Sequence, residues 1–310
     1  MALKEVFVLF TMDCEPAKTD VSAHALRMSR SGPKDYEESE RSIRGYVEAV
    51  RAFGFSSTLF VHPEVAVKQR DLLLELQSRG VCLGLHLHPY KFGDGRYRRD
   101  LGAYSASEQY KLIKKAMTVW ENALGQKPLY FRPGYFSAND NTFRVLQKLG
   151  FRGGSVSCPG RELLEHYSLW SGAEPYPHRA NLNFRQLKGS SKFVEVPISV
   201  DFQRPVLKGH AGQKGYEWLY VSCTLYDHKE VLRNILKRFK VEAPRFPVIV
   251  TDTHNDQDYS NPKNPARSNL SLILNSIKRF CREMDVKPKS CTLDDLCDLV
   301  LSERLPKDRS

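Results

Sequence analysis

The feature that most constrains the fold is a regular alternation of short apolar runs with longer amphipathic stretches. Residues 6–12 (VFVLFTM) are apolar except for one threonine, as expected of a strand that is buried on both faces. Further apolar runs at 57–61, 81–86 and 248–251 are separated by segments with helical spacing. The pattern therefore predicts an α/β fold whose parallel strands form a closed or nearly closed barrel.

Helices are expected between these strands, several of them ending at a glycine such as Gly54, Gly80 or Gly125. The expected helices are 40–53, 63–79, 105–124, 139–149, 227–239, 268–284 and 292–302, and the remaining expected strands are 129–131, 151–157 and 193–198. No change of composition divides the chain. We therefore expect a single catalytic domain over residues 1–310, with irregular insertions near 15–40 and 158–222.

Composition and charge exclude several classes of protein. The chain has 47 Lys and Arg against 36 Asp and Glu, a formal charge of +11, but these basic residues are dispersed and predict no nucleic-acid partner. The chain contains no run of about 18 apolar residues, so we expect no membrane span. The chain starts without a secretory pattern, and its seven cysteines lack C-x-x-C spacing, so we expect free thiols in a cytoplasmic protein.

Residues able to carry chemistry cluster where the predicted strands end. They are Asp13, Glu15, His86, His88, Arg132 and His254. In parallel α/β folds the carboxyl ends of the strands meet at one edge, where function sits. His86 and His88 are two residues apart, so on an extended backbone they point the same way and can share a target. Each residue alone is commonplace, but together they provide the residue types of a hydrolytic metal site.

These motifs resemble those of the polysaccharide deacetylases, the fourth family of carbohydrate esterases, over about residues 5–300. The family's first motif is Thr-Phe-Asp-Asp-Gly, and Thr11-Met-Asp-Cys-Glu15 stands in its place. The resemblance implies that Asp13 is the catalytic base. Cys14 replaces the family's metal-binding aspartate, and Glu15 resembles the Asp-x-Glu form of divergent branches.

The later motifs follow in the family's order. His86 matches the first histidine of motif two, while Tyr90 falls where the second would be, and His88 is the substitute that the shared strand face allows. Residues 131–135 (FRPGY) resemble motif three, and His254 falls at motif five.

The resemblance implies a distorted (β/α) barrel with seven or eight parallel strands. It also implies a metal-dependent hydrolase that removes an acetyl group from an N-acetylated sugar: a glycan, a glycan precursor or a sugar nucleotide. We expect a divalent cation, with zinc as the preferred ion, bound by His86, His88 and Glu15. Asp13 and the Cys14 thiolate stay open as alternatives to Glu15 for the acidic ligand. Asp13 is the expected base, and His254 the expected acid toward the leaving amine.

The remaining expected roles concern transition-state and substrate contacts. Arg132 would hold the base carboxylate charged and aimed, and the backbone N–H of Tyr135 is a candidate oxyanion donor. In the irregular stretch 158–222, His178 and Arg179 are the expected substrate contacts. The partner is thus a small molecule or glycan, and self-association of the chain is left open.

Two other functions stay open on the sequence alone. The same fold can hydrolyse other carbon–nitrogen bonds, such as those of formamides and ureides, in some relatives without metal. A degenerate domain that binds glycans without catalysis is the third reading, which the retention of Asp13, His86, Arg132 and His254 disfavours. A cysteine nucleophile at Cys14, with His86 as its base, is a further minor alternative.

Overall fold

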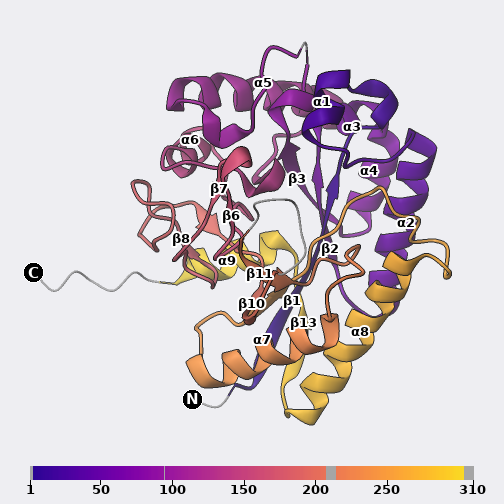
Figure 1. The fold of residues 1–310 in the computed structure, drawn as a ribbon, viewed down its shortest axis with the longest axis vertical. Coiled ribbons are helices and arrows are strands. Elements are labelled where there is room, and N and C mark those ends of the chain that lie inside the picture. Colours follow the sequence, from indigo (N-terminus) through magenta and orange to yellow (C-terminus); the bar gives the residue numbers. More distant parts are fainter. Residues whose placement is uncertain (1–2, 94, 207–213, 304–310) are drawn as a thin grey trace, which may run out of the picture.

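A curled, mostly parallel sheet with helices on its outside forms the body of the molecule (Figure 1). The computed structural model describes residues 3–93, 95–206 and 214–303. The parallel strands of the main sheet are β1 (Glu5–Cys14), β2 (Ser57–Val61), β3 (Cys82–Leu87), β4 (Tyr130–Pro133), β5 (Gly153–Gly154), β9 (Val194–Glu195), β12 (Val248–Val250) and β13 (Lys287–Ser290). The predicted (β/α) barrel architecture is confirmed.

The helices and the short outer strands complete the architecture. The α-helices are α1 (Ala23–Met28), α2 (Tyr36–Ala52), α3 (Pro63–Lys68), α4 (Arg70–Ser78), α5 (Ala106–Leu124), α6 (Thr142–Lys148), α7 (His228–Glu242), α8 (Pro265–Glu283) and α9 (Leu293–Ser302). Single 3₁₀ turns are η1 (Lys18–Asp20), η2 (Pro89–Lys91), η3 (Leu101–Ala103), η4 (Gly134–Phe136) and η5 (Leu164–His166). β8 (His178–Arg179) runs antiparallel to β9, and two hairpins pair β6 (Glu162–Leu163) with β7 (Ser168–Leu169) and β10 (Val200–Pro205) with β11 (Tyr216–Trp218).

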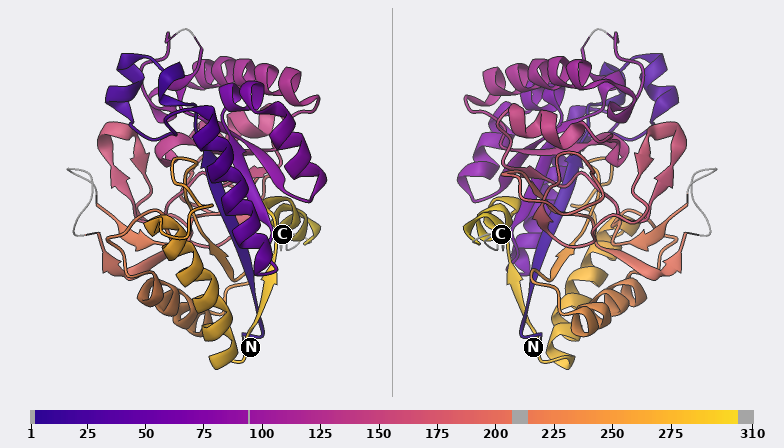
Figure 2. Two further views of the ribbon diagram at one scale, coloured as in Figure 1. Left: turned by 90° about the vertical axis from the view of Figure 1, so that its right-hand side faces the viewer. Right: turned by 90° about the vertical axis from the view of Figure 1, so that its left-hand side faces the viewer.

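β1 is the central strand of the sheet. It pairs with β2 along its second half, and with β12 and β13 along its first half. Figure 2 shows β1 running through the length of the molecule with β13 beside its start. Residues 8–14 of β1 are all buried, so the strand needs the unbroken apolar run that the sequence provides.

The barrel has a seam between β9 and β12. Within the described residues the sheet order runs from β12 to β8 without a main-chain ladder joining β9 to β12. Ser199 bridges this gap: its Oγ donates to the carbonyl of Val248 at 2.9 Å and accepts from the amide of Val250 at 2.9 Å. At this seam one side chain supplies the hydrogen bonds that main-chain groups supply elsewhere in the sheet. The closure of the barrel is therefore irregular here.

Several expected elements differ from the observed ones. Residues 63–79 form two helices, α3 and α4, because Gln69 leaves the helical conformation. The side-chain amide of Gln69 accepts a hydrogen bond from the hydroxyl of Ser39 and donates one to the carbonyl of Tyr36. The expected 15–40 loop contains α1, and α2 already starts at Tyr36. β13 was missed because its sequence, KPKS, is polar.

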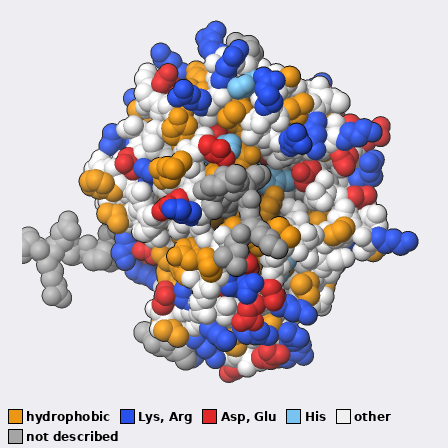
Figure 3. All heavy atoms as spheres, viewed as in Figure 1, with side chains coloured by type: hydrophobic (Ala, Val, Ile, Leu, Met, Phe, Trp, Pro, Cys, Tyr) orange, Lys and Arg blue, Asp and Glu red, His pale blue; other side chains and the backbone are white. Residues whose placement is uncertain are grey.

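The surface agrees with the dispersed charge of the sequence. On the face in Figure 3, Lys and Arg side chains are scattered, with Asp and Glu between them. None of the helices within the described ranges combines the length and the apolar character that crossing a membrane requires. The extent of the domain as residues 1–310 stays a prediction. Residues 207–213 of the expected 158–222 insertion lie outside the described residues.

Candidate active site

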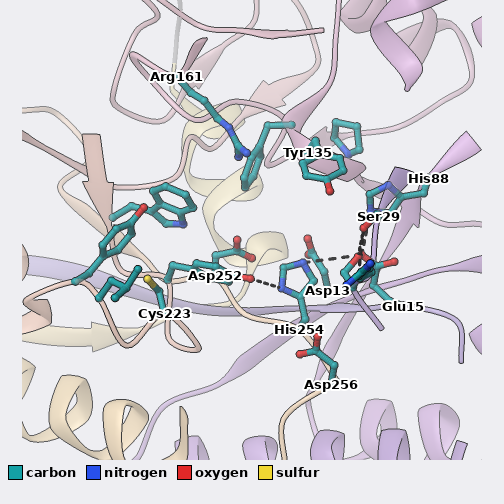
Figure 4. Close-up of a pocket in the computed structure, with 18 residues that line it drawn as sticks. Asp13, Glu15, Ser29, His88, Tyr135, Arg161, Cys223, Asp252, His254 and Asp256 are labelled. Atoms are coloured by element: carbon teal, nitrogen blue, oxygen red, sulfur yellow. Dashed lines mark hydrogen bonds and ion pairs between the residues drawn. The ribbon is translucent and has the colours of Figure 1, made fainter. Parts of the chain in front are cut away.

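Polar side chains from the carboxyl ends of β1, β3 and β4 and from the segment after β12 meet at the mouth of the barrel (Figure 4). Almost all of them are buried, which is unusual for charged residues and requires that they pair with one another. The predicted set Asp13, Glu15, His86, His88, Arg132 and His254 is brought together there.

Side chains at the end of β1 alternate between the two faces of the strand. Asp13 and Glu15 face the cavity, whereas Cys14 belongs to the buried hydrophobic core. Burial, with the charges of Asp13 and Glu15, raises the pKa of the Cys14 thiol well above its ordinary value. Cys14 does not line the cavity in the described chain, so the structure does not support the alternatives that made it a metal ligand or a nucleophile.

The turn after β12 holds the end of β1 in place. The amide of Asp13 donates to the carbonyl of Thr253 at 2.8 Å. The side chain of Asn255 accepts from the amide of Glu15 at 2.8 Å and donates to its carbonyl at 3.0 Å. The two segments, 240 residues apart in the chain, are thus locked together beside the carboxylates.

Glu15, His86 and His88 form a buried cluster that can hold a metal ion, since one donor atom from each lies within 4.8 Å of the others. His88 Nε2 is 2.9 Å from Glu15 Oε1, and His86 Nε2 is 3.7 Å from the same oxygen. Burial lowers the pKa of His88 to about 3, so its imidazole is neutral, which is the ligand form.

The hydrogen bonding of His86 tests whether these residues fit a metal. Its Nδ1 lies 3.0 Å from the carbonyl oxygen of Arg132, which can only accept, so Nδ1 carries the proton. Nε2 then presents a lone pair, and this buried atom has no hydrogen-bond partner within the described residues. A second partner fixing the tautomer of a ligating histidine is the usual arrangement in metal sites. The donor set therefore fits a divalent cation.

Two residues that sequence reasoning did not assign support this cluster. The hydroxyl of Tyr90 shares a hydrogen bond of 2.7 Å with His88 Nδ1. The fully buried ammonium of Lys91 lies 2.7 Å from Glu15 Oε2 and also donates to the carbonyl of Ser31 at 2.8 Å. Burial alone would raise the pKa of Glu15, but His88 and Lys91 outweigh it and hold that pKa well below its ordinary value.

Beside the cluster, Arg132 joins two carboxylates. Its Nη1 donates to Asp13 at 2.9 Å and to Asp252 at 3.1 Å, and also to the hydroxyl of Thr11 at 2.8 Å. Burial, reinforced by the charge of Asp13, raises the pKa of Asp252 to about 6. The arginine therefore neutralises a pair of acids that could not otherwise both be ionised at this depth.

His254 lies beside Asp13, with which it forms a parallel β-bridge. Its Nδ1 is 3.2 Å from the hydroxyl of Tyr220, and its Nε2 is 3.9 Å from Glu15 Oε1. Burial would lower the pKa of His254, but the charges of Asp252 and Asp13 exceed this effect and raise it above the ordinary value. The histidine is thus held as a proton carrier next to the carboxylates.

These groups open into a cavity of about 640 Å³, within the range of small-molecule sites. Tyr135 lines it, in contact with the ring of His88 and stacked on His166 with ring centroids 3.8 Å apart. Tyr135 and Phe136 both adopt left-handed backbone conformations, with φ of 56° and 55°, which non-glycine residues seldom do. This strained turn after β4 places both aromatic side chains in the cavity wall.

His178 and Arg179 are not brought to this cavity, and the expectation that they contact the substrate there is not met. They form β8, at the far edge of the sheet. His178 Nδ1 bonds the carbonyl of Tyr176, and Arg179 donates to the carbonyls of Leu301 and Glu303. Their polar character, read from the sequence as substrate contact, serves to close the end of the sheet onto the C-terminal helix.

The comparisons with known proteins agree with this geometry. Residues 34–154 match the family model for polysaccharide deacetylase, a span that contains His86, His88 and Arg132 but not Asp13 or Glu15. No curated protein of similar sequence was found.

Two solved structures share the fold. One is a Mycobacterium smegmatis protein provisionally described as a polysaccharide deacetylase, with 16% identity, a TM-score of 0.60 and coverage of 99% of this chain and 95% of that one. The other is PuuE allantoinase, with 14% identity, a TM-score of 0.55 and coverage of 94% and 89%. The resemblance inferred from the motifs is confirmed over residues 34–154, which match the polysaccharide deacetylase family model, and the fold is that of the Mycobacterium smegmatis protein.

Proposed function

We propose that the chain is a metal-dependent hydrolase that removes the acetyl group from an N-acetylated sugar. The observation that carries this proposal is the buried cluster of Glu15, His86 and His88, in which His86 Nε2 has no partner in the described chain. Asp13 and His254, a base and an acid, lie beside this cluster in one cavity. The family match supports the reaction class.

The proposed ion is zinc, bound by Glu15 Oε1 and by the Nε2 atoms of His86 and His88. Two imidazoles and a carboxylate leave a coordination position open, as catalytic zinc sites do. When bound, the cation would polarise the acetyl carbonyl and make water more acidic. Cys14 contributes nothing to this site, because it faces the core.

Asp13 is the proposed general base, which takes a proton from the attacking water. Arg132 keeps its carboxylate oriented through the 2.9 Å contact, and it prevents repulsion between Asp13 and Asp252. Base catalysis of this kind contributes roughly 10²–10⁴-fold in rate.

His254 is the proposed acid, which donates a proton to the departing amine nitrogen. The hydroxyl of Tyr220 orients its ring through Nδ1, which leaves Nε2 for the proton transfer. The backbone N–H of Tyr135 stays our candidate for stabilising the negative charge that forms on the acetyl oxygen when water attacks the carbonyl carbon.

A sugar ring fits the aromatic side of the cavity. Trp218 and Tyr220 stack with ring centroids 5.5 Å apart and line the same cavity as Tyr135. Flat aromatic faces of this kind bind the apolar faces of sugar rings. The volume of about 640 Å³ suits a small acetylated sugar or the end of a glycan.

Hydrolysis of another carbon–nitrogen bond, without metal, is the second candidate. The observation favouring it is the ion pair of Lys91 with Glu15, because a fixed ammonium already neutralises the carboxylate that would bind the cation. PuuE allantoinase, with a TM-score of 0.55, is similar in fold alone. A third candidate is a domain that binds glycans without catalysis.

Metal analysis of the purified protein, paired with acetate release from a panel of N-acetylated sugars, tests the proposal. We expect close to one zinc per chain, activity that chelation abolishes, and recovery when zinc is restored. His86→Ala should lose both metal and activity, whereas His24→Ala, at a histidine whose partner within the described residues is the carbonyl of Arg98, should keep both.

Each other outcome points to a different candidate. Activity on amides that survives complete removal of metal would replace the proposal by the second candidate. A folded, metal-free protein that binds glycans and hydrolyses none of the panel would support the third. The identity of the metal, the cytoplasmic location and the oligomeric state stay predictions.

A further inference from the structure

Arg161 is a buried cation in the wall of the cavity that forms no ion pair in the described chain. Only 6% of the residue is exposed, and its side chain makes no hydrogen bond or ion pair to residues 3–93, 95–206 or 214–303. The other two buried cations of the site are paired: Arg132 with Asp13 at 2.9 Å and Lys91 with Glu15 at 2.7 Å. Charged side chains are rarely buried unless they are paired, so Arg161 is the exception that needs an explanation.

The guanidinium of Arg161 is held in place by aromatic rings. Its central carbon lies 5.6 Å from the ring centroid of Phe136 and 5.6 Å from that of Trp218. The backbone is fixed as well, since the amide of Arg161 donates to the carbonyl of Cys158 and its carbonyl accepts from Trp170. Aromatic contacts stabilise the charge but accept no in-plane hydrogen bond, so the N–H edge of the guanidinium is left to bind a ligand.

The charges of the cavity are separated between its two sides. Asp13, Glu15 and Asp252 lie at the proposed reaction centre, and Figure 4 shows Arg161 reaching toward the cavity from the side opposite Asp252 and His254. Since Arg132 and Lys91 at the reaction centre are already paired with carboxylates, an anionic group is attracted to Arg161 in preference to them. A substrate with a negative charge at one end and an amide at the other would bind in one orientation only.

Trp218 adds a second donor near the same position. Its indole Nε1 is buried without a partner in the described residues, and the indole can only donate. A ligand group with several acceptor oxygens can accept hydrogen bonds from both Arg161 and Trp218, which a single hydroxyl does less well.

We propose that Arg161 binds a carboxylate or a phosphate of the substrate, and that the substrate is an N-acetylated sugar that carries this negative charge. The inference rests on the proposed function, since it assigns a second subsite in the same cavity. It predicts that a neutral acetylated sugar is a poor substrate, even when its acetyl group is identical.

The test compares N-acetylglucosamine 6-phosphate and N-acetylmuramic acid, a carboxylate, with neutral N-acetylglucosamine. We expect the wild-type protein to prefer at least one charged compound. Arg161→Gln should lower kcat/KM for that compound by roughly 100-fold, the effect of removing one partner of a buried charged pair, and change the neutral compound less than about threefold. The better of the two charged compounds shows whether phosphate or carboxylate is bound.

Two further variants keep a structural role distinguishable from ligand binding. Arg161→Lys retains the charge but loses the planar fork, so it should restore part of the preference for the charged compound. Arg41→Gln, at an exposed arginine of α2, should leave every rate unchanged. An equal loss of activity on charged and neutral sugars in Arg161→Gln would overturn the proposal. So would a wild-type protein that prefers the neutral sugar, whether or not the variant folds.

Binding without turnover separates this proposal from the proposed reaction. Glucose 6-phosphate carries the anion but no acetyl group, and calorimetry should show that wild-type protein binds it and Arg161→Gln does not. If it binds in this way while no acetylated sugar is hydrolysed, the anion subsite stands and the deacetylase proposal fails. If neutral sugars are deacetylated and glucose 6-phosphate does not bind, the subsite fails and the deacetylase proposal stands.

Discussion

Gly134 packs directly against the imidazole of His88. A Cβ atom at position 134 would lie 2.1 Å from both Nδ1 and Cε1 of that ring, a distance that real Cβ contacts do not show. Gly134→Ala must therefore displace His88 from the metal cluster. We predict a fall in affinity for zinc of roughly 10- to 100-fold, the usual effect of disturbing the support of a ligand. Competition with a chromophoric chelator would measure it.

Gly125→Ala is the matched control for this prediction. Gly125 ends α5 with φ of 73° and has no atom within 4 Å of its Cβ position, so alanine there strains the backbone without touching the site. It should lower the free energy of unfolding and leave zinc affinity unchanged. Wild-type zinc affinity in Gly134→Ala would show that His88 is not a ligand.

Tyr90→Phe removes the hydroxyl that bonds His88 Nδ1 at 2.7 Å. Without this partner the imidazole loses its fixed orientation, and we expect zinc affinity to fall by about tenfold while the fold is kept. Tyr110→Phe, on the partly exposed side of α5, is the control and should bind zinc as the wild-type protein does. Equal affinity in both variants would mean that Tyr90 has no part in holding the ligand.

Asp13→Asn and Glu15→Gln should fail in different ways, although the two residues are neighbours on one strand face. Asparagine cannot take the proton from water, so Asp13→Asn should reduce kcat by roughly 10²–10⁴-fold and retain zinc. Glu15→Gln removes the anionic ligand and should lose the metal as well. Metal content and initial rates, measured on the same preparations, check both. Retention of zinc by Glu15→Gln together with its loss from Asp13→Asn would exchange the two roles.

Glu195 makes stability depend on pH. Its buried carboxylate accepts hydrogen bonds from the amides of Val156 and Ser157, yet burial outweighs them and raises the pKa of Glu195 to about 7. The folded protein thus holds this proton more tightly than the unfolded chain. The contribution to stability is complete below the ordinary pKa of a glutamate and is lost as pH rises through about 7.

Glu195→Gln isolates this effect, because the amide oxygen can accept the same hydrogen bonds and does not titrate. Each unit of pKa shift corresponds to about 1.4 kcal/mol, so the wild-type protein should lose a few kcal/mol more than the variant between pH 5 and pH 8. Urea unfolding at the two pH values gives this difference. Identical pH dependence in both proteins would mean that Glu195 keeps an ordinary pKa.

The strand ends could be predicted from sequence because they follow a simple rule. Residues two apart on a strand share a face, and this rule predicted that His86 and His88 share a target; the structure shows the same relation for Asp13 and Glu15. The same rule excludes Cys14, which lies between the two carboxylates and points into the core.

The supporting residues could not be predicted in this way. Lys91 meets Glu15 across 76 residues of sequence, and nothing local distinguishes it from the exposed lysines of the chain. Arg161, His178 and Arg179 all lie in one irregular stretch, whose path depends on tertiary contacts rather than on periodicity. Only the three-dimensional structure shows that Arg161 lines the cavity, whereas His178 and Arg179 lie at the edge of the sheet.

The serine bridge at the seam has a consequence for how such a protein can change. Ser199, and not a strand ladder, links β9 to β12 in the described chain, and within the connecting stretch 200–247 the main chain of residues 219–221 bonds that of Asp252. That stretch includes Trp218 and Tyr220, on the sugar side of the cavity. Substitutions at these two aromatic side chains would therefore alter the sugar-binding wall and leave the polar groups on β1, β3 and β4 in place.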